Sequence, residues 1–193
     1  MGVDIAMEML RVALRRSSGL VRYDGWRMPF TDATFDAAYM VWVIHLVDDQ
    51  GAILRETARV LRPFGRLVIA TLDREPDDQI RRVTEPMYRS LLGENWLRDD
   101  LDRVTAAASY AELREVTRVV GIPFLLETSG DAEAARIEER TSSIFWDLSD
   151  QEWGEHVVPV IDRLRAMGPA PLRRERTHEV LVLEKQATTR ATR

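Results

Sequence analysis

Two acidic residues near the start of the chain stand where a carboxylate could bind a ligand. Asp4 follows the short stretch Gly2-Val3, and Asp24 follows an apolar segment and precedes Gly25. A carboxylate at the carboxyl end of a parallel strand faces the crevice where such sheets bind nucleotides, and it can accept hydrogen bonds from both hydroxyls of a ribose. Simpler interpretations stay open, because Asp4 could only cap a helix and Asp24-Gly25 is ordinary turn chemistry.

An aromatic residue, Trp42, and a histidine, His45, lie near the end of the apolar stretch from Phe35 to Leu46. Trp42 could present its ring to a bound nucleoside, and it could equally be a core residue. His45 is a candidate base for a reaction in which an oxygen or nitrogen must lose a proton, and the alternative is a structural histidine. His156 and His178 lack ligand spacing, so we expect no metal site.

The elements that must position these residues follow from hydrophobic periodicity. Apolar residues at helical spacing predict helices over residues 5–16, 52–61, 109–120 and 151–167. Short apolar runs predict strands over residues 20–23, 35–46, 66–71, 124–128 and 178–183. The run 35–46 is too unbroken to alternate, which predicts a strand buried on both faces. Alternating strands and helices in the first 75 residues predict an α/β fold with a Rossmann-like, doubly wound and mostly parallel sheet.

The length and the later pattern predict how the chain is organised. A chain of 193 residues favours a single domain over 1–193. Residues 75–108 and 130–170 are predicted to be helical insertions that form a cap. Pairs of aspartates at 48–49, 77–78 and 99–100 are predicted to be helix caps and solvated turns rather than acid/base pairs. Ser149 with Glu152 has capping-box spacing.

Composition narrows the classes of function. The net charge of −5 disfavours nucleic acid as a partner. With no cysteine, the chain offers neither disulfides nor thiolate metal sites. No segment approaches the ~20 apolar residues that span a bilayer, and the first ten residues have no signal-peptide pattern, so we expect no membrane contact and a cytoplasmic location.

Three segments together resemble the class I S-adenosylmethionine-dependent methyltransferases, in particular those that act on small molecules. Gly2-Val3-Asp4-Ile5 with Met9-Leu10 is similar to the end of the family's second strand. Asp24-Gly25-Trp26-Arg27-Met28-Pro29-Phe30, followed by Phe35-Asp36-Ala37, is similar to the segment that covers the adenine and opens the fourth strand. Ala58-Arg59-Val60-Leu61-Arg62-Pro63-Phe64-Gly65-Arg66-Leu67-Val68-Ile69 is close to the family's A-R-V-L-R-P-G-G-R-L-V-I.

The resemblance implies a fold, a cofactor and a set of site residues. S-adenosylmethionine would be the cofactor and a small molecule the methyl acceptor. If that acceptor must lose a proton, His45 is the candidate base nearest to the site in the sequence. The implied cofactor-binding residues are Asp4, Ile5, Asp24, Gly25 and Trp42. Asp4 would bind the ribose, Asp24 would accept a hydrogen bond from the adenine amino group, and Gly25 would let the backbone approach the ring. The aromatics Trp96, Phe145, Trp146 and Trp153 hint at an apolar or planar acceptor.

One element of the family is missing from this sequence. The family's first strand carries a glycine-rich loop under the methionine part of the cofactor, whereas no two of the ten glycines here lie within two residues of each other. That strand would lie in the middle of the sheet, and an unfilled gap would leave backbone groups unpaired at about 1 to 3 kcal/mol each. Three explanations stay open: a sequence shortened at its start, remaining strands that close up, or an edge covered by another copy or a partner. The alternative function is a truncated or non-catalytic methyltransferase-like protein that does not bind the cofactor productively. A third possibility is a Rossmann-like protein that binds another nucleotide.

Overall fold

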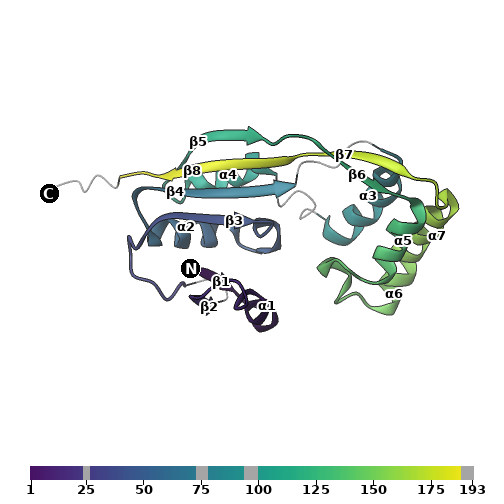
Figure 1. The fold of residues 1–193 in the computed structure, drawn as a ribbon, viewed down its shortest axis with the longest axis horizontal. Helices are drawn as coiled ribbons and strands as arrows, with labels where there is room; N and C mark the ends of the chain where they lie inside the picture. The colour runs from purple at the N-terminus through teal and green to yellow at the C-terminus, as the bar shows by residue number, and fades with distance from the viewer. Residues whose placement is uncertain (24–26, 73–77, 94–99, 188–193) are drawn as a thin grey trace. The chain divides into compact units, whose positions relative to one another are not determined.

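The computed structural model describes residues 1–23, 27–72, 78–93 and 100–187 (Figure 1). The described residues form two compact units. The first is drawn from Met1–Thr71, Asp99–Val119 and Val180–Arg193, and the second from Leu72–Arg98 and Val120–Glu179. Each unit has its own cluster of buried apolar side chains.

A four-stranded sheet with two helices on one face makes up most of the first unit. Its strands, in spatial order, are β3 (Phe35–Val41), β4 (Leu61–Leu72), β8 (His178–Lys185) and β5 (Leu113–Val120). Helices α2 (Gln50–Val60) and α4 (Leu101–Ser109) pack side by side. Leu54 of α2 and Val104 of α4 are fully buried together with Ile69 of β4 and Leu181 of β8. The core therefore lies between this pair of helices and the sheet.

A smaller sheet is formed by the first residues of the chain. Strand β1 (Gly2–Asp4) pairs in parallel with β2 (Leu20–Arg22), and helix α1 (Met7–Ala13) connects them. Strands β3 and β4 also pair in parallel, so the alternation of strands and helices predicted for the first 75 residues is present. Helix α1 is shorter than the predicted range 5–16.

Strand β3 is buried on one face only, which corrects the prediction that residues 35–46 form a strand covered on both sides. Met40 lies in the core, whereas Tyr39 is 77% exposed and Val41 49% exposed. The strand also ends at Val41, and Ile44–Leu46 form a 3₁₀ turn. Sequence alone shows that these residues are apolar. It does not show which of them have a packing partner.

The second unit combines helices with a two-stranded antiparallel sheet. The sheet pairs β6 (Phe124–Thr128) with β7 (Leu172–Arg176). The helices are α3 (Gln79–Leu92), α5 (Gly130–Glu138), α6 (Asp150–Glu152), a π-helical segment at Trp153–Val157, and α7 (Val158–Met167). Phe145 and Leu164 are buried in the centre of its core, with Val157.

Two predicted boundaries need correction. Most of the predicted helix 109–120 is strand β5 (Leu113–Val120) instead, because Val116, Thr117, Val119 and Val120 are β-branched and favour extended backbone. Residues 101–108 belong to α4, whose Leu101, Val104 and Ala108 are core residues of the first unit rather than part of an inserted cap. Helix α5 and strand β7 were not predicted as separate elements.

Side-chain caps start several of the helices, as predicted from the acidic pairs. Asp49 accepts a hydrogen bond from the Ala52 N–H at 2.8 Å, Asp78 from the Arg81 N–H at 2.9 Å, and Asp100 from the Asp102 N–H at 2.9 Å. Ser149 and Glu152 form the predicted capping box. Among the described residues, no helix has the length and apolar character needed to cross a membrane.

Candidate functional site

Asp4 lies at the carboxyl end of β1, where the sequence predicted a ligand-binding carboxylate. Its side chain is half-buried, and its Oδ1 accepts a hydrogen bond from the Ala6 N–H at 2.8 Å. Its backbone carbonyl accepts a hydrogen bond from the Tyr23 N–H at 2.8 Å. The bond to Ala6 gives the carboxylate a structural role at the start of α1, and it occupies only one of about four lone-pair sites of the group.

A cavity of about 280 Å³ borders Asp4. It is lined by residues of β1, by Leu10 and Ala13 of α1, and by Tyr39 of β3. Its lining combines apolar side chains with a carboxylate, which is the usual character of a small-molecule site, although its volume lies just below the usual range of about 300 to 1,000 Å³. Asp4 is thus a carboxylate that a ligand could reach.

The structure places the other predicted site residues as follows. Ile5 is exposed, and its carbonyl accepts a hydrogen bond from Nε of Arg22 at 3.1 Å. His45 is exposed within the 3₁₀ turn after β3. Asp24 and Gly25 lie outside the described residues.

Trp42 follows the last residue of β3 and has an unusual backbone conformation. Its φ is 55°, its side chain is about half exposed, and its N–H donates to the Ala70 carbonyl at 3.0 Å. A bulky residue with positive φ is a genuine outlier, and such residues cluster at functional sites. Phe64 and three other residues also have a positive φ, so the conformation does not single out Trp42. Because its side chain is half exposed, Trp42 is not the core residue of the simpler interpretation, and a ligand-facing role stays a prediction.

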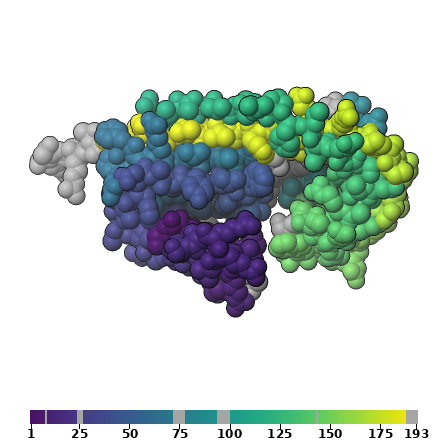
Figure 2. All heavy atoms as spheres, in the orientation of Figure 1, coloured from purple at the N-terminus to yellow at the C-terminus, as the bar shows by residue number. Residues whose placement is uncertain are grey.

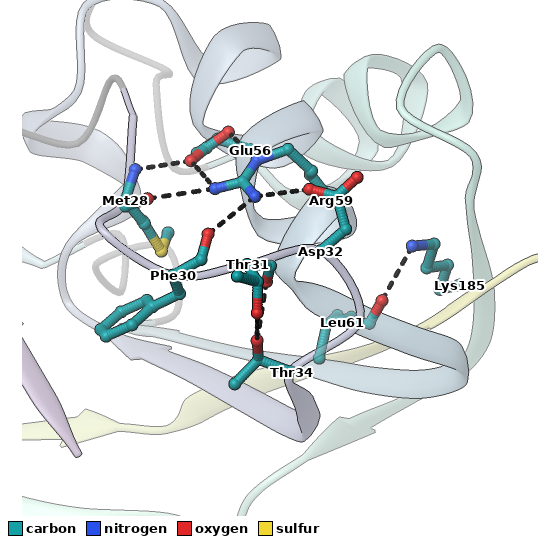
Figure 3. Close-up of polar contacts among 9 residues, drawn as sticks. All are labelled: Met28, Phe30, Thr31, Asp32, Thr34, Glu56, Arg59, Leu61 and Lys185. Carbon is teal, nitrogen blue, oxygen red and sulfur yellow. Dashed lines mark hydrogen bonds and ion pairs between the residues drawn. The ribbon is translucent and has the colours of Figure 1, made fainter.

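Two residues that the sequence analysis did not assign a role hold the segment that follows Asp24 and Gly25. Figure 3 shows Glu56 and Arg59 of α2 directed at this segment. The Met28 N–H donates to Oε1 of Glu56 at 2.5 Å, and the guanidinium of Arg59 donates to the carbonyls of Met28 at 3.1 Å and Phe30 at 2.8 Å. Arg59 also pairs with Asp32 at 2.7 Å. Helix α2 therefore fixes the path of residues 28–32.

The charges in this cluster stabilise one another. The hydrogen bond from Arg59 holds the pKa of Glu56 below its ordinary value, against the opposing effect of burial. The hydrogen bonds to Glu56 and Asp32 raise the pKa of Arg59, which stays cationic. A signal for this pair was present in the sequence: a glutamate and an arginine three positions apart on a helix that otherwise buries apolar residues.

Two of the aromatic residues that suggested an apolar or planar acceptor, Phe145 and Trp153, pack together in the core of the second unit. The ring of Phe145, which is 1% exposed, lies 6.1 Å from that of Tyr88 and 5.9 Å from that of Trp153. The guanidinium of Arg140 lies 4.2 Å from the centre of the Trp153 ring. Trp146 is exposed and donates from Nε1 to the Arg140 carbonyl, while Trp96 lies outside the described residues. Within the described part of the chain, no group of three His, Cys, Asp or Glu could hold a metal ion.

The first part of the chain is similar in sequence to known proteins. Residues 1–69 match the family model described as a methyltransferase domain. Demethylmenaquinone methyltransferase from Corynebacterium kroppenstedtii is 43% identical over 68 residues, which are 35% of this chain and 30% of the relative. The enzyme of the same name from Tropheryma whipplei is 35% identical over 96 residues, or 47% of this chain and 38% of the relative. The matches thus span about a third of the length of these curated relatives.

Solved structures resemble the fold over nearly the whole chain. The YcgJ protein from Bacillus subtilis has a TM-score of 0.53 at 18% identity, covering 96% of this chain and 82% of that one. A SAM-dependent methyltransferase from Thermotoga maritima has a TM-score of 0.52 at 16% identity, covering 96% and 73%. Together these findings confirm the Rossmann-like fold class and the resemblance of the chain to the class I S-adenosylmethionine-dependent methyltransferases.

Proposed function

We propose that this chain takes part in methyl transfer from S-adenosylmethionine to a small-molecule acceptor. Its resemblance to the class I methyltransferases supports this proposal. The observation that carries the proposal is the position of Asp4, a half-buried carboxylate that lines a cavity at the carboxyl end of a parallel strand. Asp4 also falls within the matched residues 1–69. In this proposal the nucleoside of the cofactor lies at the carboxyl ends of β1 and β2.

The residues present fit the nucleoside half of the cofactor. With one lone-pair site of Asp4 used by the Ala6 N–H, the carboxylate retains acceptors for two ribose hydroxyls. The Glu56 and Arg59 cluster would hold residues 28–32 in place beside the adenine-binding residues that the resemblance implies. For the methionine half, the glycine-rich loop of the family is absent from the sequence, and we assign no residue to that part.

Methyl transfer depends more on the alignment of the reactants and on the exclusion of water than on acid or base catalysis. S-adenosylmethionine supplies a methyl group on a sulfonium, whose leaving group departs as a neutral thioether. Such an in-line displacement depends on alignment and on exclusion of water. Trp42 would contribute an apolar wall beside the cofactor. His45, exposed in the turn after β3, would accept a proton only from an acceptor that must lose one.

A quinone-type acceptor is the first one to assay. Two of the relatives carry the name demethylmenaquinone methyltransferase, although the match covers only about a third of the length of each relative. The acceptor in our proposal is therefore a small molecule, with demethylmenaquinone as the first candidate.

Isothermal titration with S-adenosylhomocysteine tests the proposal. Asp4→Asn keeps one oxygen for the Ala6 N–H and replaces the other with an amide NH₂, which cannot accept a hydrogen bond. Loss of a hydrogen bond to a charged group costs about 1.5 to 3 kcal/mol, so we expect the Kd to rise roughly tenfold to a hundredfold. The matched control is Asp36→Asn, at an exposed aspartate paired with Arg62, which should leave the Kd unchanged. Absence of binding by the unmodified chain, or equal binding by Asp4→Asn, would contradict the proposal.

A further inference from the structure

Strand β6 and the residues just before it expose apolar side chains. The exposed fraction is 90% for Ile122 and 66% for Leu125, and Val120, Phe124 and Leu126 are each more than a third exposed. Figure 2 shows the green atoms of this stretch at the surface of the second unit. Single apolar residues on a surface are ordinary, whereas a contiguous run of them is typical of an interaction surface.

The backbone of β6 offers a second kind of contact at the same place. One side of the strand pairs antiparallel with β7, and no described strand pairs with its other side. Every second residue of a strand directs its N–H and carbonyl to this other side. A further strand can therefore add there. Because the apolar side chains belong to the same strand, one added strand would contact both the backbone and the side chains.

The sequence of β6 is suited to pair antiparallel with itself. When two copies meet across a two-fold axis at Leu125, Leu125 lies opposite Leu125 of the second copy and Phe124 lies opposite its Leu126. Apolar residues then meet apolar residues at all three positions. An axis at Leu126 would place Glu127 opposite Leu125, and an axis at Phe124 would use residues that precede the strand. The apolar pattern thus favours Leu125 as the centre.

The charges near this edge are compatible with such a pair. Glu127 lies directly across from Arg173 of β7 in its own chain, so the Glu127 carboxylate has a neighbour of opposite charge. In a pair centred on Leu125, the two copies of Glu127 lie at opposite ends of the paired strands, about 14 Å apart along them. The residue opposite each of them is the uncharged Pro123. Like charges, which would destabilise the pair, therefore do not meet across it.

We propose that β6 is the contact of a dimer, in which two copies of this chain pair antiparallel and join their β6–β7 sheets into one of four strands. Both copies use the same edge, so the assembly closes at two. The match of the strand with itself favours a second copy over a foreign strand or a lipid surface. An exposed apolar patch on a monomer measures about 300 to 600 Å², and a stable interface needs about 800 Å² per partner. The dimer is therefore of modest affinity, with a Kd above about 1 μM.

Sedimentation velocity of the full chain at about 1 to 200 μM tests the proposal. No cofactor is added, so the outcome is independent of the proposed methyl transfer. We expect the mass to rise from that of a monomer to that of a dimer. Leu125→Glu and Leu125→Lys each place like charges opposite each other on the axis, and each should raise the Kd of the dimer at least tenfold.

Mixing the two variants makes the test specific for the axis. An equimolar mixture places a carboxylate opposite an ammonium group, and it should form dimers that neither variant forms alone. Both substitutions change an exposed side chain, so the unfolding midpoints should stay close to that of the unmodified chain. Tyr110→Glu is the matched control, because this residue is 84% exposed in the first unit, and it should dimerise normally.

Introduced cysteines locate the axis, because the chain has no cysteine of its own. Residues opposite each other in an antiparallel pair have Cα atoms about 4.5 to 5.5 Å apart, which suits a disulfide. Oxidation with diamide should cross-link Leu125→Cys at least tenfold faster than Leu126→Cys, whose two copies are displaced from each other along the strands.

Four outcomes would overturn the proposal. They are a monomer at the highest concentration, a dimer that Leu125→Glu leaves intact, a mixture of the two charged variants that stays monomeric, and faster cross-linking of Leu126→Cys than of Leu125→Cys. A monomer that binds phosphatidylcholine vesicles through β6 would also overturn it, because the apolar surface would then belong to a lipid contact.

Discussion

Glu56 and Arg59 of α2 form a bidentate ion pair, and both side chains also form hydrogen bonds with the segment 28–32. Nη2 of Arg59 lies 2.6 Å from Oε1 of Glu56, and Nε lies 2.9 Å from Oε2. Both side chains are largely buried, with exposures of 10% for Glu56 and 29% for Arg59. Oε1 of Glu56 also accepts from the Met28 N–H, and Arg59 also donates to the carbonyls of Met28 and Phe30 and to the Asp32 side chain. One pair thus connects a helix to the segment preceding β3.

Removing the guanidinium should destabilise the protein markedly. Arg59→Ala leaves the buried Glu56 carboxylate without its partner and two carbonyls without a donor, and we expect a loss of about 2 to 3 kcal/mol in the free energy of unfolding. Urea unfolding measures this change. The matched control is Arg62→Ala, whose pair with Asp36 is exposed and should contribute less than about 1 kcal/mol. Equal losses for the two variants would contradict the role assigned to Arg59.

The same pair predicts a dependence of stability on acid. Because the pKa of Glu56 is lowered from 4.5 by the hydrogen bond from Arg59, the folded state favours the ionised carboxylate. Its stabilisation is complete above the ordinary pKa and is lost as the pH falls below it, through the lowered pKa. Urea midpoints of the unmodified chain should therefore fall more steeply below about pH 4.5 than those of Glu56→Gln. Parallel pH profiles for the two proteins would contradict this prediction.

Phe64 should be replaceable by glycine with a gain in stability. Its φ is 64°, and its side chain is 66% exposed near the start of β4, where the pairing with β3 shifts register. Left-handed backbone costs a residue with a Cβ about 1 to 2 kcal/mol, while glycine loses about 0.5 to 1 kcal/mol of chain entropy. We expect Phe64→Gly to raise the free energy of unfolding by about 0.5 to 1 kcal/mol. The control Phe64→Ala keeps the unfavourable φ and should show no such gain.

Gly130 marks a close contact between α5 and α7 of the second unit. A Cβ at this position would overlap the Leu164 carbonyl oxygen and would lie 2.7 Å from Cβ of Met167. Gly130→Ala should therefore cost about 1 to 3 kcal/mol, the usual penalty for overpacking. Gly154→Ala is the matched control, since a Cβ there would have no other group within 4 Å, and it should be neutral or slightly stabilising. Thermal unfolding of both variants distinguishes the two sites.

Much of the fold of the first unit could be predicted, because its elements have clear local signals. The run from Phe35, the helix ending at Val60 and the strand ending at Leu72 lie close to their predicted positions. Strand β5 was predicted as a helix because Tyr110, Leu113 and Val116 fit helical spacing, while pairing beside β8 decides the outcome. Such pairing depends on residues about 65 positions away in the sequence, which periodicity within a short window does not record.

The candidate site was predicted in part. Asp4 is at a strand end beside a cavity, as the sequence indicated, and Trp42 directly follows β3. The roles of Glu56 and Arg59 were missed because their partners are backbone atoms of Met28 and Phe30. A sequence shows which side chains can form hydrogen bonds, but it does not show which main-chain groups need one.

Asp78 couples two distant parts of the second unit through a single side chain. One oxygen caps the first turn of α3 by accepting from the Arg81 N–H, and the other pairs at 2.6 Å with Arg174 of β7, whose side chain is 4% exposed. The start of that helix cannot fray without releasing the buried arginine from its partner, Asp78. The helix end and the strand should consequently open as one cooperative block, so that thermal fluctuations of this unit begin elsewhere.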